Sequence, residues 1–388
     1  MTENSNSTDN LPQCYEPWYE LNTMYNGRVA CCCYYNGPAS RLDLDRWPDL
    51  FSYWNGDFLR KVRAEVVGRI PDDSGCKGCV MYKYRSHEEM RQHFLVARTQ
   101  VLSPAQRENR ERAMANFTAG KLVVDHVPLR FYFNFGVSCN INCIMCCQTP
   151  ERPSHQTLNA ERLLAWKPHM VKTETISVIG GEPLILPEAI KFIRAIVSDD
   201  DFAQVRLDLF TNGLNLDKFL DELSAKSNLN VCVSLDGIGA TYEHIRAGSS
   251  WSRVERNILS FKEMAASRNL DWTIGTANIV MKSSLSTIDE LARWHVEHDI
   301  PPNFVDFMNF SGIEETYFKE NVFAFPDLLA EVPDWRQRLD AAIRVLNEKE
   351  WFSSADILIK MKLDLITRLF APFPEAPPTM QCNVNKGE

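Results

Sequence analysis

Apolar and polar positions along residues 129–310 form a regular succession of short and long segments. Short apolar runs rich in β-branched and aromatic residues are typical of buried strands, and longer stretches with helical spacing separate them. The runs that predict strands cover residues 130–137, 175–179, 205–210, 230–234, 272–280 and 304–310. The stretches that predict helices lie near residues 160–169, 187–197, 216–226, 252–267 and 286–298.

Six strands that alternate with helices predict successive βα units and a parallel sheet, with right-handed connections. The expected fold is therefore α/β, a partial (β/α)6 TIM-like barrel. The active site of such a barrel lies at the C-terminal ends of its strands.

The segments on either side of the predicted barrel have a different character. Residues 11–80 are rich in Cys, Trp, Tyr, Gly and Pro and show little periodicity, which is typical of a small domain held by metal. We expect a disordered tail at residues 1–10, this cysteine-rich domain at 11–85, a charged helical connector at 86–126, the barrel at 127–315, and a C-terminal helical extension and tail at 316–388.

Composition narrows the class of protein further. The chain has 388 residues, 45% hydrophobic and 24% charged, which is ordinary for a soluble globular protein. Its net charge of −9 and its lack of a long basic run argue against nucleic acid as a partner. Neither a membrane-spanning run nor the apolar region of a signal peptide is evident, so we expect no membrane partner. We expect a cytoplasmic protein, because the cysteine sites described below would need a reducing environment.

The cysteines supply the first candidate chemistry. Ten of the twelve precede residue 150 and form two groups, which indicates two metal sites. In the second group, Cys139, Cys143 and Cys146 have the spacing CxxxCxxC and directly follow the first barrel strand. Three thiolates in one loop can hold three irons of a 4Fe–4S cluster and leave the fourth iron open to a ligand.

Other special residues follow the next three strands of the predicted barrel. Taken singly, Gly, Asn and Asp at these positions are ordinary turn formers. Three such loops in succession beside a metal loop favour a ligand site, because small residues let a ligand approach the backbone. The loops are Gly180-Gly181-Glu182-Pro183, Thr211-Asn212-Gly213 and Ser234-Leu235-Asp236-Gly237.

With these motifs, residues 127–310 resemble the radical S-adenosylmethionine (SAM) superfamily. The resemblance implies that the cysteine loop holds the SAM-binding cluster and that the GGE motif holds the methionyl amine. Arg246 would meet the SAM carboxylate, Met145 would pack on the adenine, and Asn278 would reach the adenosine. The full set of implied cofactor-binding residues is Gly180, Gly181, Glu182, Pro183, Asn212, Ser234, Asp236, Arg246, Asn278 and Met145.

The same resemblance implies the chemistry. An electron from the reduced cluster cleaves SAM, and the 5′-deoxyadenosyl radical removes a hydrogen atom from the substrate. Such an enzyme needs a reducing partner, for example flavodoxin or ferredoxin. A non-catalytic iron–sulfur or zinc protein is the remote alternative, and the GGE motif argues against it.

The first cysteine group resembles the auxiliary-cluster modules called SPASM and twitch, and the one-cluster twitch version fits better. The implied ligands of an auxiliary 4Fe–4S cluster are Cys14, Cys32, Cys76 and Cys79. The known modules usually follow the barrel, whereas this one precedes it. The sequence leaves open which of Cys31, Cys32 and Cys33 binds, and it also permits a structural zinc site.

Two reaction outcomes follow from the resemblance. An auxiliary cluster that accepts an electron gives oxidation, whereas a hydrogen-atom donor on the opposite face gives epimerisation. Cys232 and Cys147 are candidate donors, and Cys382 is a weaker one. The expected substrate is a small molecule such as a sugar or aminocyclitol, and modification of a peptide or protein is the alternative.

Overall fold

The computed structural model describes residues 11–35, 37, 40–41, 49–68, 70–77, 79, 101–148, 156–307 and 314–370. The expected tail at residues 1–10, residues 86–100 of the charged connector, and Cys382 lie outside these ranges. Two compact units are present. Unit 1 comprises residues 1–134, 157–177 and 199–207, and unit 2 comprises residues 135–156, 178–198 and 208–388. The predicted domain boundaries stay a prediction, since compactness alone does not show which segments fold independently.

Unit 1 contains a strand that the sequence did not predict. Strand β1 (Glu20–Met24) runs parallel to β4 (Arg130–Asn134), so a segment of the cysteine-rich region joins the sheet beside the first barrel strand. All five residues of β1 are buried, and three of them are polar, so no alternation of apolar and polar positions marks the strand. Strands β2 (Arg28–Ala30) and β3 (Ser40–Arg41) continue the sheet in antiparallel fashion.

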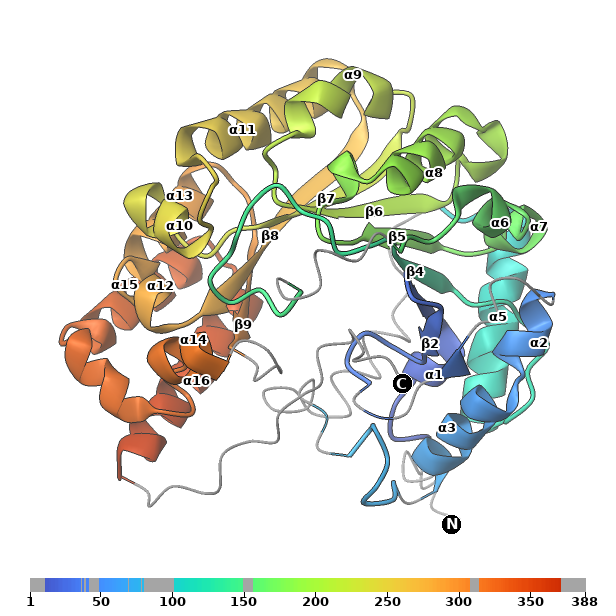
Figure 1. Ribbon diagram of the computed structural model, residues 1–388, viewed down its shortest axis with the longest axis horizontal. Coiled ribbons are helices and arrows are strands. Elements are labelled where there is room, and N and C mark those ends of the chain that lie inside the picture. Colours follow the sequence, from blue (N-terminus) through green and yellow to red (C-terminus); the bar gives the residue numbers. More distant parts are fainter. Residues whose placement is uncertain are drawn as a thin grey trace, which may run out of the picture. The chain divides into compact units, whose positions relative to one another are not determined.

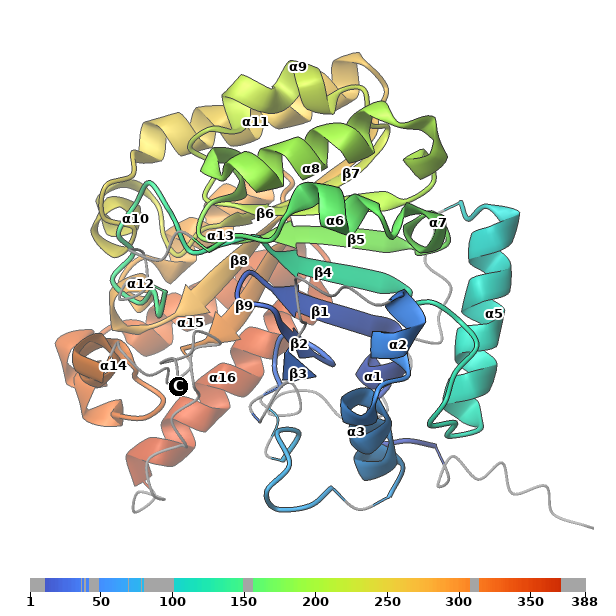
Figure 2. The same ribbon diagram turned by 45° about the vertical axis from the view of Figure 1, so that its right-hand side comes forward.

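The helices of unit 1 hold this region together. Helix α1 (Glu16–Tyr19) contacts both α3 (Asp57–Val67) and α5 (Pro104–Thr118). Figure 2 shows α1 beside α3. Arg63 of α3 is fully buried and donates hydrogen bonds to the carbonyl oxygens of Pro17, Trp54 and Leu122 at 2.9–3.0 Å. The remaining elements that lie wholly in unit 1 are α2 (Leu50–Trp54), α6 (Ala160–Leu164), α7 (Lys167–Met170) and the 3₁₀ turn η5 (Asp200–Phe202).

Unit 2 holds the later strands of the sheet. Strand β7 (Asn228–Ser234) runs parallel to β8 (Asp271–Val280), which runs parallel to β9 (Pro302–Asp306). The border between the units crosses β5 (Thr175–Ile179) and β6 (Arg206–Thr211). Helices α11 (Trp251–Ser267) and α13 (Ile288–Glu297) lie on the outer face of β7 and β8 (Figure 1). The other elements of unit 2 are η4 (Pro183–Ile185), α8 (Pro187–Ser198), η6 (Leu216–Phe219), α9 (Leu220–Leu223), α10 (Gly239–Ile245), α12 (Lys282–Leu285), α14 (Glu314–Glu320), η7 (Pro326–Glu331), α15 (Trp335–Glu348) and α16 (Phe352–Phe370).

The expected fold class is confirmed. Strands β4 to β9 follow one another in sheet order as they do along the chain, as in a partial (β/α)6 barrel, and each overlaps a predicted strand. Strand β4 ends at Asn134, earlier than predicted, because the chain beyond it turns toward the loop after β5. None of the described helices combines the length and the apolar character that crossing a membrane requires.

Candidate radical SAM site

The cysteine loop, residues 138–146, is tied by its backbone to the end of α10. Asn142 N donates to Ala247 O at 2.7 Å, and Ile144 N donates to Ile245 O at 2.9 Å. The bonded residues lie directly before and after Cys143 in the cysteine loop, and directly before and after Arg246 at the end of α10. All three cysteines of the motif are half-buried, and none of them is in a disulfide. The loop therefore presents its thiols from a fixed backbone beside a fixed arginine.

The GGE loop after β5 is clamped to the start of the cysteine loop. Gly181 N donates to Gly136 O at 2.8 Å, and Glu182 N donates to Ser138 O at 2.9 Å. A Cβ atom at Gly181 would lie 2.2 Å from Ser138 O, so only glycine fits this approach. The two motifs, which are well separated in the sequence, are thus in direct backbone contact in the fold.

Glu182 is fully buried and accepts three internal hydrogen bonds. Its Oε1 accepts from Thr211 Oγ1 at 2.8 Å and from Leu184 N at 3.1 Å, and its Oε2 accepts from Asn212 N at 2.7 Å. Burial raises the pKa of the carboxyl, and the three donors oppose that shift. Three of roughly four acceptor positions are therefore in use, and Glu182 braces the loop after β6. The contact with the SAM amine stays a prediction.

Asn212, the residue that Glu182 braces, points back to the cysteine loop. Its Nδ2 donates to Asn140 Oδ1 at 2.8 Å and lies 3.8 Å from Cys139 Sγ. Gly213 follows with φ +79°, a conformation that glycine adopts without strain. The turn after β6 thus places the side-chain amide of Asn212 next to the first cysteine of the motif.

Asp236 and Arg246 form a buried ion pair beside Cys143. Arg246 Nη2 lies 2.6 Å from Asp236 Oδ2, and Arg246 Nη1 donates to Cys143 Sγ at 3.5 Å. Asp236 Oδ1 also accepts from Ile279 N at 2.7 Å. Burial raises the pKa of Asp236, which Arg246 opposes; burial lowers the pKa of Arg246, but the charges of Asp236 and Cys143 more than offset this. The net pKa shift is upward for both groups, and each carries a close partner of opposite charge.

Asn278 is buried among structural partners. Its Nδ2 donates to Leu235 O and lies 3.3 Å from His295 Nε2, while its Oδ1 accepts from Thr276 Oγ1 at 2.8 Å. These contacts hold the end of β7 against α13, and the predicted adenosine contact stays a prediction. The sequence did not single out His295, since a lone histidine on the apolar face of a helix carries no signal.

The other residues implied by the resemblance have plainer surroundings. Met145 is buried in an apolar cluster with Ile245, Met281 and Phe307. Ser234 is half-buried at the end of β7, and Pro183 begins η4. Cys232 is a half-buried thiol on the same face of β7 as Ser234, since side chains alternate along a strand. Cys147 is disulfide-bonded, so in this state it has no S–H to donate.

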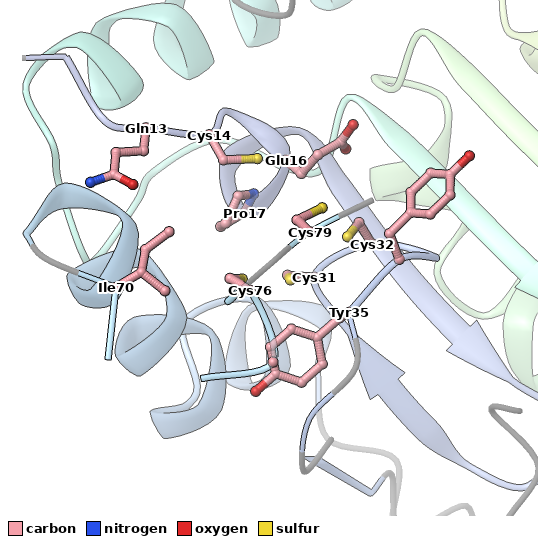
Figure 3. Close-up of a pocket in the computed structure, with 12 residues that line it drawn as sticks. Gln13, Cys14, Glu16, Pro17, Cys31, Cys32, Tyr35, Ile70, Cys76 and Cys79 are labelled. Atoms are coloured by element: carbon pink, nitrogen blue, oxygen red, sulfur yellow. The ribbon is translucent and has the colours of Figure 1, made fainter. Parts of the chain in front are cut away.

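A second cluster of cysteines lies in unit 1. Cys14, Cys31, Cys32, Cys76 and Cys79 line one pocket, here called the cysteine pocket, which has about 380 Å³ of atom-free space including its open mouth (Figure 3). All four predicted auxiliary ligands lie here.

Cys31 is the thiol that the predicted ligand set left out. It hydrogen-bonds to the thiols of Cys32 and Cys76, which together with burial raises its pKa well above the usual value. Cys33 is not among the residues that line the cysteine pocket. Cys31 and Cys32 therefore line the pocket, and which of the three consecutive cysteines binds a cluster stays a prediction. Among the described residues, no group of three or more His, Cys, Asp or Glu side chains forms a site for a single metal ion.

The site in unit 2 fits the cofactors that its motifs imply. Three thiols in one loop can ligate a 4Fe–4S cluster with one open iron. Arg246 Nε is a buried donor that has no acceptor in the described part of the chain, as an anionic ligand would supply. Fold and site together define an α/β protein with a three-cysteine loop and a buried Asp–Arg pair at the rim of a partial barrel.

Comparison with known proteins finds a family model that matches part of the chain. Residues 133–295 match the family model described as Radical SAM superfamily, so the chain contains a radical SAM domain. It is 25% identical to GTP 3′,8-cyclase of Peptoclostridium acidaminophilum over 203 residues, 50% of this chain and 60% of the cyclase. It is 26% identical to the sporulation killing factor maturation protein SkfB of Bacillus subtilis over 124 residues, 31% of this chain and 29% of that protein.

The chain therefore spans 60% of the length of the cyclase and 29% of the length of SkfB, less than two thirds of either relative. Among solved structures, native anSMEcpe with bound AdoMet matches with a TM-score of 0.35 at 18% identity, over 45% of this chain and 50% of that one.

Proposed function

We propose that this chain is a radical SAM enzyme. When bound, a 4Fe–4S cluster and SAM would supply reductive cleavage of SAM to a 5′-deoxyadenosyl radical that removes a hydrogen atom from the substrate. The observation that carries the proposal is the clamp between the GGE loop and the three-cysteine loop, with Gly181 packed against Ser138 O. A protein that only stored a cluster would not need this second loop.

Each implied residue then has a defined task. Cys139, Cys143 and Cys146 ligate three irons. The loop of Gly180, Gly181, Glu182 and Pro183 holds the methionyl amine. Because Glu182 already accepts three hydrogen bonds, its main contribution is to fix the backbone of this loop and of Asn212. The further contacts to SAM are assigned to Ser234, Asp236, Arg246, Asn278 and Met145.

The cysteine pocket is proposed to hold an auxiliary 4Fe–4S cluster of the SPASM or twitch kind. The proposed ligands are Cys14, Cys32, Cys76 and Cys79, with Cys31 as the substitute for Cys32. Their common position around one pocket supports the proposal. A structural zinc ion is the alternative, and metal analysis separates the two.

The proposed reaction is oxidation or epimerisation of a small molecule such as a sugar or aminocyclitol. Cys232 is the preferred hydrogen-atom donor for epimerisation, because Cys147 must first be reduced to a thiol. The names of the relatives support both substrate classes: GTP 3′,8-cyclase names a nucleotide, and SkfB is a maturation protein. Modification of a peptide therefore stays the second candidate.

The proposed setting is the cytoplasm, where a flavodoxin or ferredoxin supplies the electron. The deciding test is formation of 5′-deoxyadenosine by anaerobically reconstituted, reduced protein given SAM. The wild type is expected to form it, and the variant Cys139→Ala/Cys143→Ala/Cys146→Ala is expected to form none. Equal formation by both would refute the proposal. Adding candidate sugars, nucleotides or peptides and measuring which one accelerates the reaction then separates the substrate classes.

A further inference from the structure

We propose that Arg246, held in place by Asp236, tunes the cluster by donating a charged hydrogen bond to the Cys143 thiolate, which makes the cluster easier to reduce. The inference rests on the proposed function, since it requires a cluster at the cysteine loop. It gives Arg246 a task that exists before SAM binds. The resemblance implied a different task, contact with the SAM carboxylate.

The backbone fixes the donor against the sulfur. The hydrogen bonds Asn142 N to Ala247 O and Ile144 N to Ile245 O lie on either side of Cys143 and Arg246. This pairing holds the backbones of Cys143 and Arg246 side by side, and the Arg246 side chain is 9% exposed. The 3.5 Å contact from Arg246 Nη1 to Cys143 Sγ is therefore built into the fold rather than made by a flexible surface side chain.

The opposite side of the guanidinium is fixed as well. Arg246 Nη2 meets Asp236 Oδ2 at 2.6 Å, and Asp236 Oδ1 accepts from Ile279 N at 2.7 Å. The side chain of Asp236 is fully buried and that of Arg246 is 9% exposed, so solvent screens neither charge well. Asp236 is thus a positioning residue that acts through Arg246.

The electrostatic consequence has a definite sign. Hydrogen bonds to cluster sulfurs and nearby charge set the reduction potential. The reduced cluster carries one more negative charge than the oxidised cluster, so a cation at the thiolate favours the reduced form. Arg246 Nη1 contacts Cys143 Sγ at 3.5 Å, whereas Asp236 contacts the guanidinium at Nη2, so the positive member of the pair faces the sulfur. The pair therefore favours the reduced cluster.

The test measures the midpoint potential of the cluster by EPR-monitored titration, without SAM and then with SAM. The relevant signal is the one that disappears in the variant Cys139→Ala/Cys143→Ala/Cys146→Ala. In Arg246→Met, the midpoint potential should fall by about 59 mV or more. At the applied potential equal to the wild-type midpoint, this lowers the ratio of reduced to oxidised cluster by about tenfold or more for a one-electron couple. Arg246→Lys keeps the charge and should shift the potential less.

Two further variants control the result. Arg246→Met leaves Asp236 buried without its cation, so Asp236→Asn/Arg246→Met removes both charges and should still lower the potential. Arg253→Met removes an arginine that pairs with Asp217 at 3.7 Å, is 37% exposed, and should leave the potential unchanged. The shift should be present without SAM, whereas an arginine that only held the SAM carboxylate would shift the potential only with SAM.

The outcomes are distinguishable. Wild-type protein without iron would refute the proposed function itself. A cluster with the wild-type midpoint in both Arg246→Met and the double variant would overturn the tuning role. Loss of the cluster in the double variant, with the cluster retained in Arg253→Met, would assign Arg246 a structural role and would also overturn the inference.

Discussion

Removing the Glu182 carboxylate should destabilise the fold in a graded way. Glu182→Gln can keep its oxygen toward Thr211 and Leu184, but its amide then faces Asn212 N, so one buried donor loses its acceptor. A buried unsatisfied donor costs about 1–3 kcal/mol. Glu182→Ala removes the acceptor of all three donors and should cost about 3 kcal/mol or more.

The assay is urea unfolding of both variants beside wild type, with hydrogen exchange to locate the change. Glu263→Gln, an exposed glutamate on α11, is the matched control and should stay within about 0.5 kcal/mol of wild type. The backbone amides of Leu184 and Asn212 should exchange faster in Glu182→Ala. An unfolding free energy for Glu182→Ala that equals that of Glu263→Gln would refute the bracing role.

The pH dependence gives a second check on Glu182. Its folded-state pKa is raised above the ordinary value of 4.5, chiefly by burial. The folded state therefore binds the proton more tightly than the unfolded state does. The resulting contribution to the free energy of unfolding is fully present below pH 4.5 and is lost as the pH rises through the raised pKa. The penalty of Glu182→Gln should thus be larger at pH 5 than at pH 8. A penalty that shrinks on acidification would contradict the assignment.

Three further changes test separate parts of the account. Gly181→Ala puts a Cβ atom 2.2 Å from a carbonyl oxygen and should abolish 5′-deoxyadenosine formation, whereas Gly275→Ala, with 3.6 Å of clearance, should retain it. Burial lowers the pKa of His295 from 6.5 to about 3. The free energy of unfolding of the wild type should therefore fall by up to about 1.4 kcal/mol for each pH unit below pH 6.5. In His295→Gln, the urea midpoint should lack this pH dependence. Cys76→Ala should lower bound iron by about four per chain. Cys33→Ala, outside the cysteine pocket, should leave the iron content unchanged, and equal iron in these two cysteine variants would contradict the auxiliary-cluster proposal.

The barrel could be predicted from sequence because its strands are apolar and its helices amphipathic. Strand β8 alternates buried and less buried residues along its length, which is the signal that the sequence pattern carries. Strand β1 escaped prediction for the opposite reason. Glu20, Asn22 and Thr23 are polar yet buried, because both faces of the strand are covered.

The site residues were found by motif, but their partners were not. The family resemblance implied a role at the site for both Cys143 and Arg246, yet it could not show that the arginine touches the sulfur. That contact depends on backbone pairing between segments 103 positions apart. Similarly, Glu182 was expected to face the SAM amine, and in the structure its carboxylate accepts three hydrogen bonds from within the protein. Long-range pairing of this kind leaves no local pattern.

The most direct test of the central claim is the iron, sulfide and zinc content of anaerobically reconstituted protein. Wild type is compared with Cys139→Ala/Cys143→Ala/Cys146→Ala. The account predicts about eight irons per chain in the wild type, about four in the variant, and no zinc in either. Four irons falling to none with one zinc retained would make the cysteine pocket a structural zinc site. Equal iron in both proteins would contradict the assignment of the cysteine loop to a cluster.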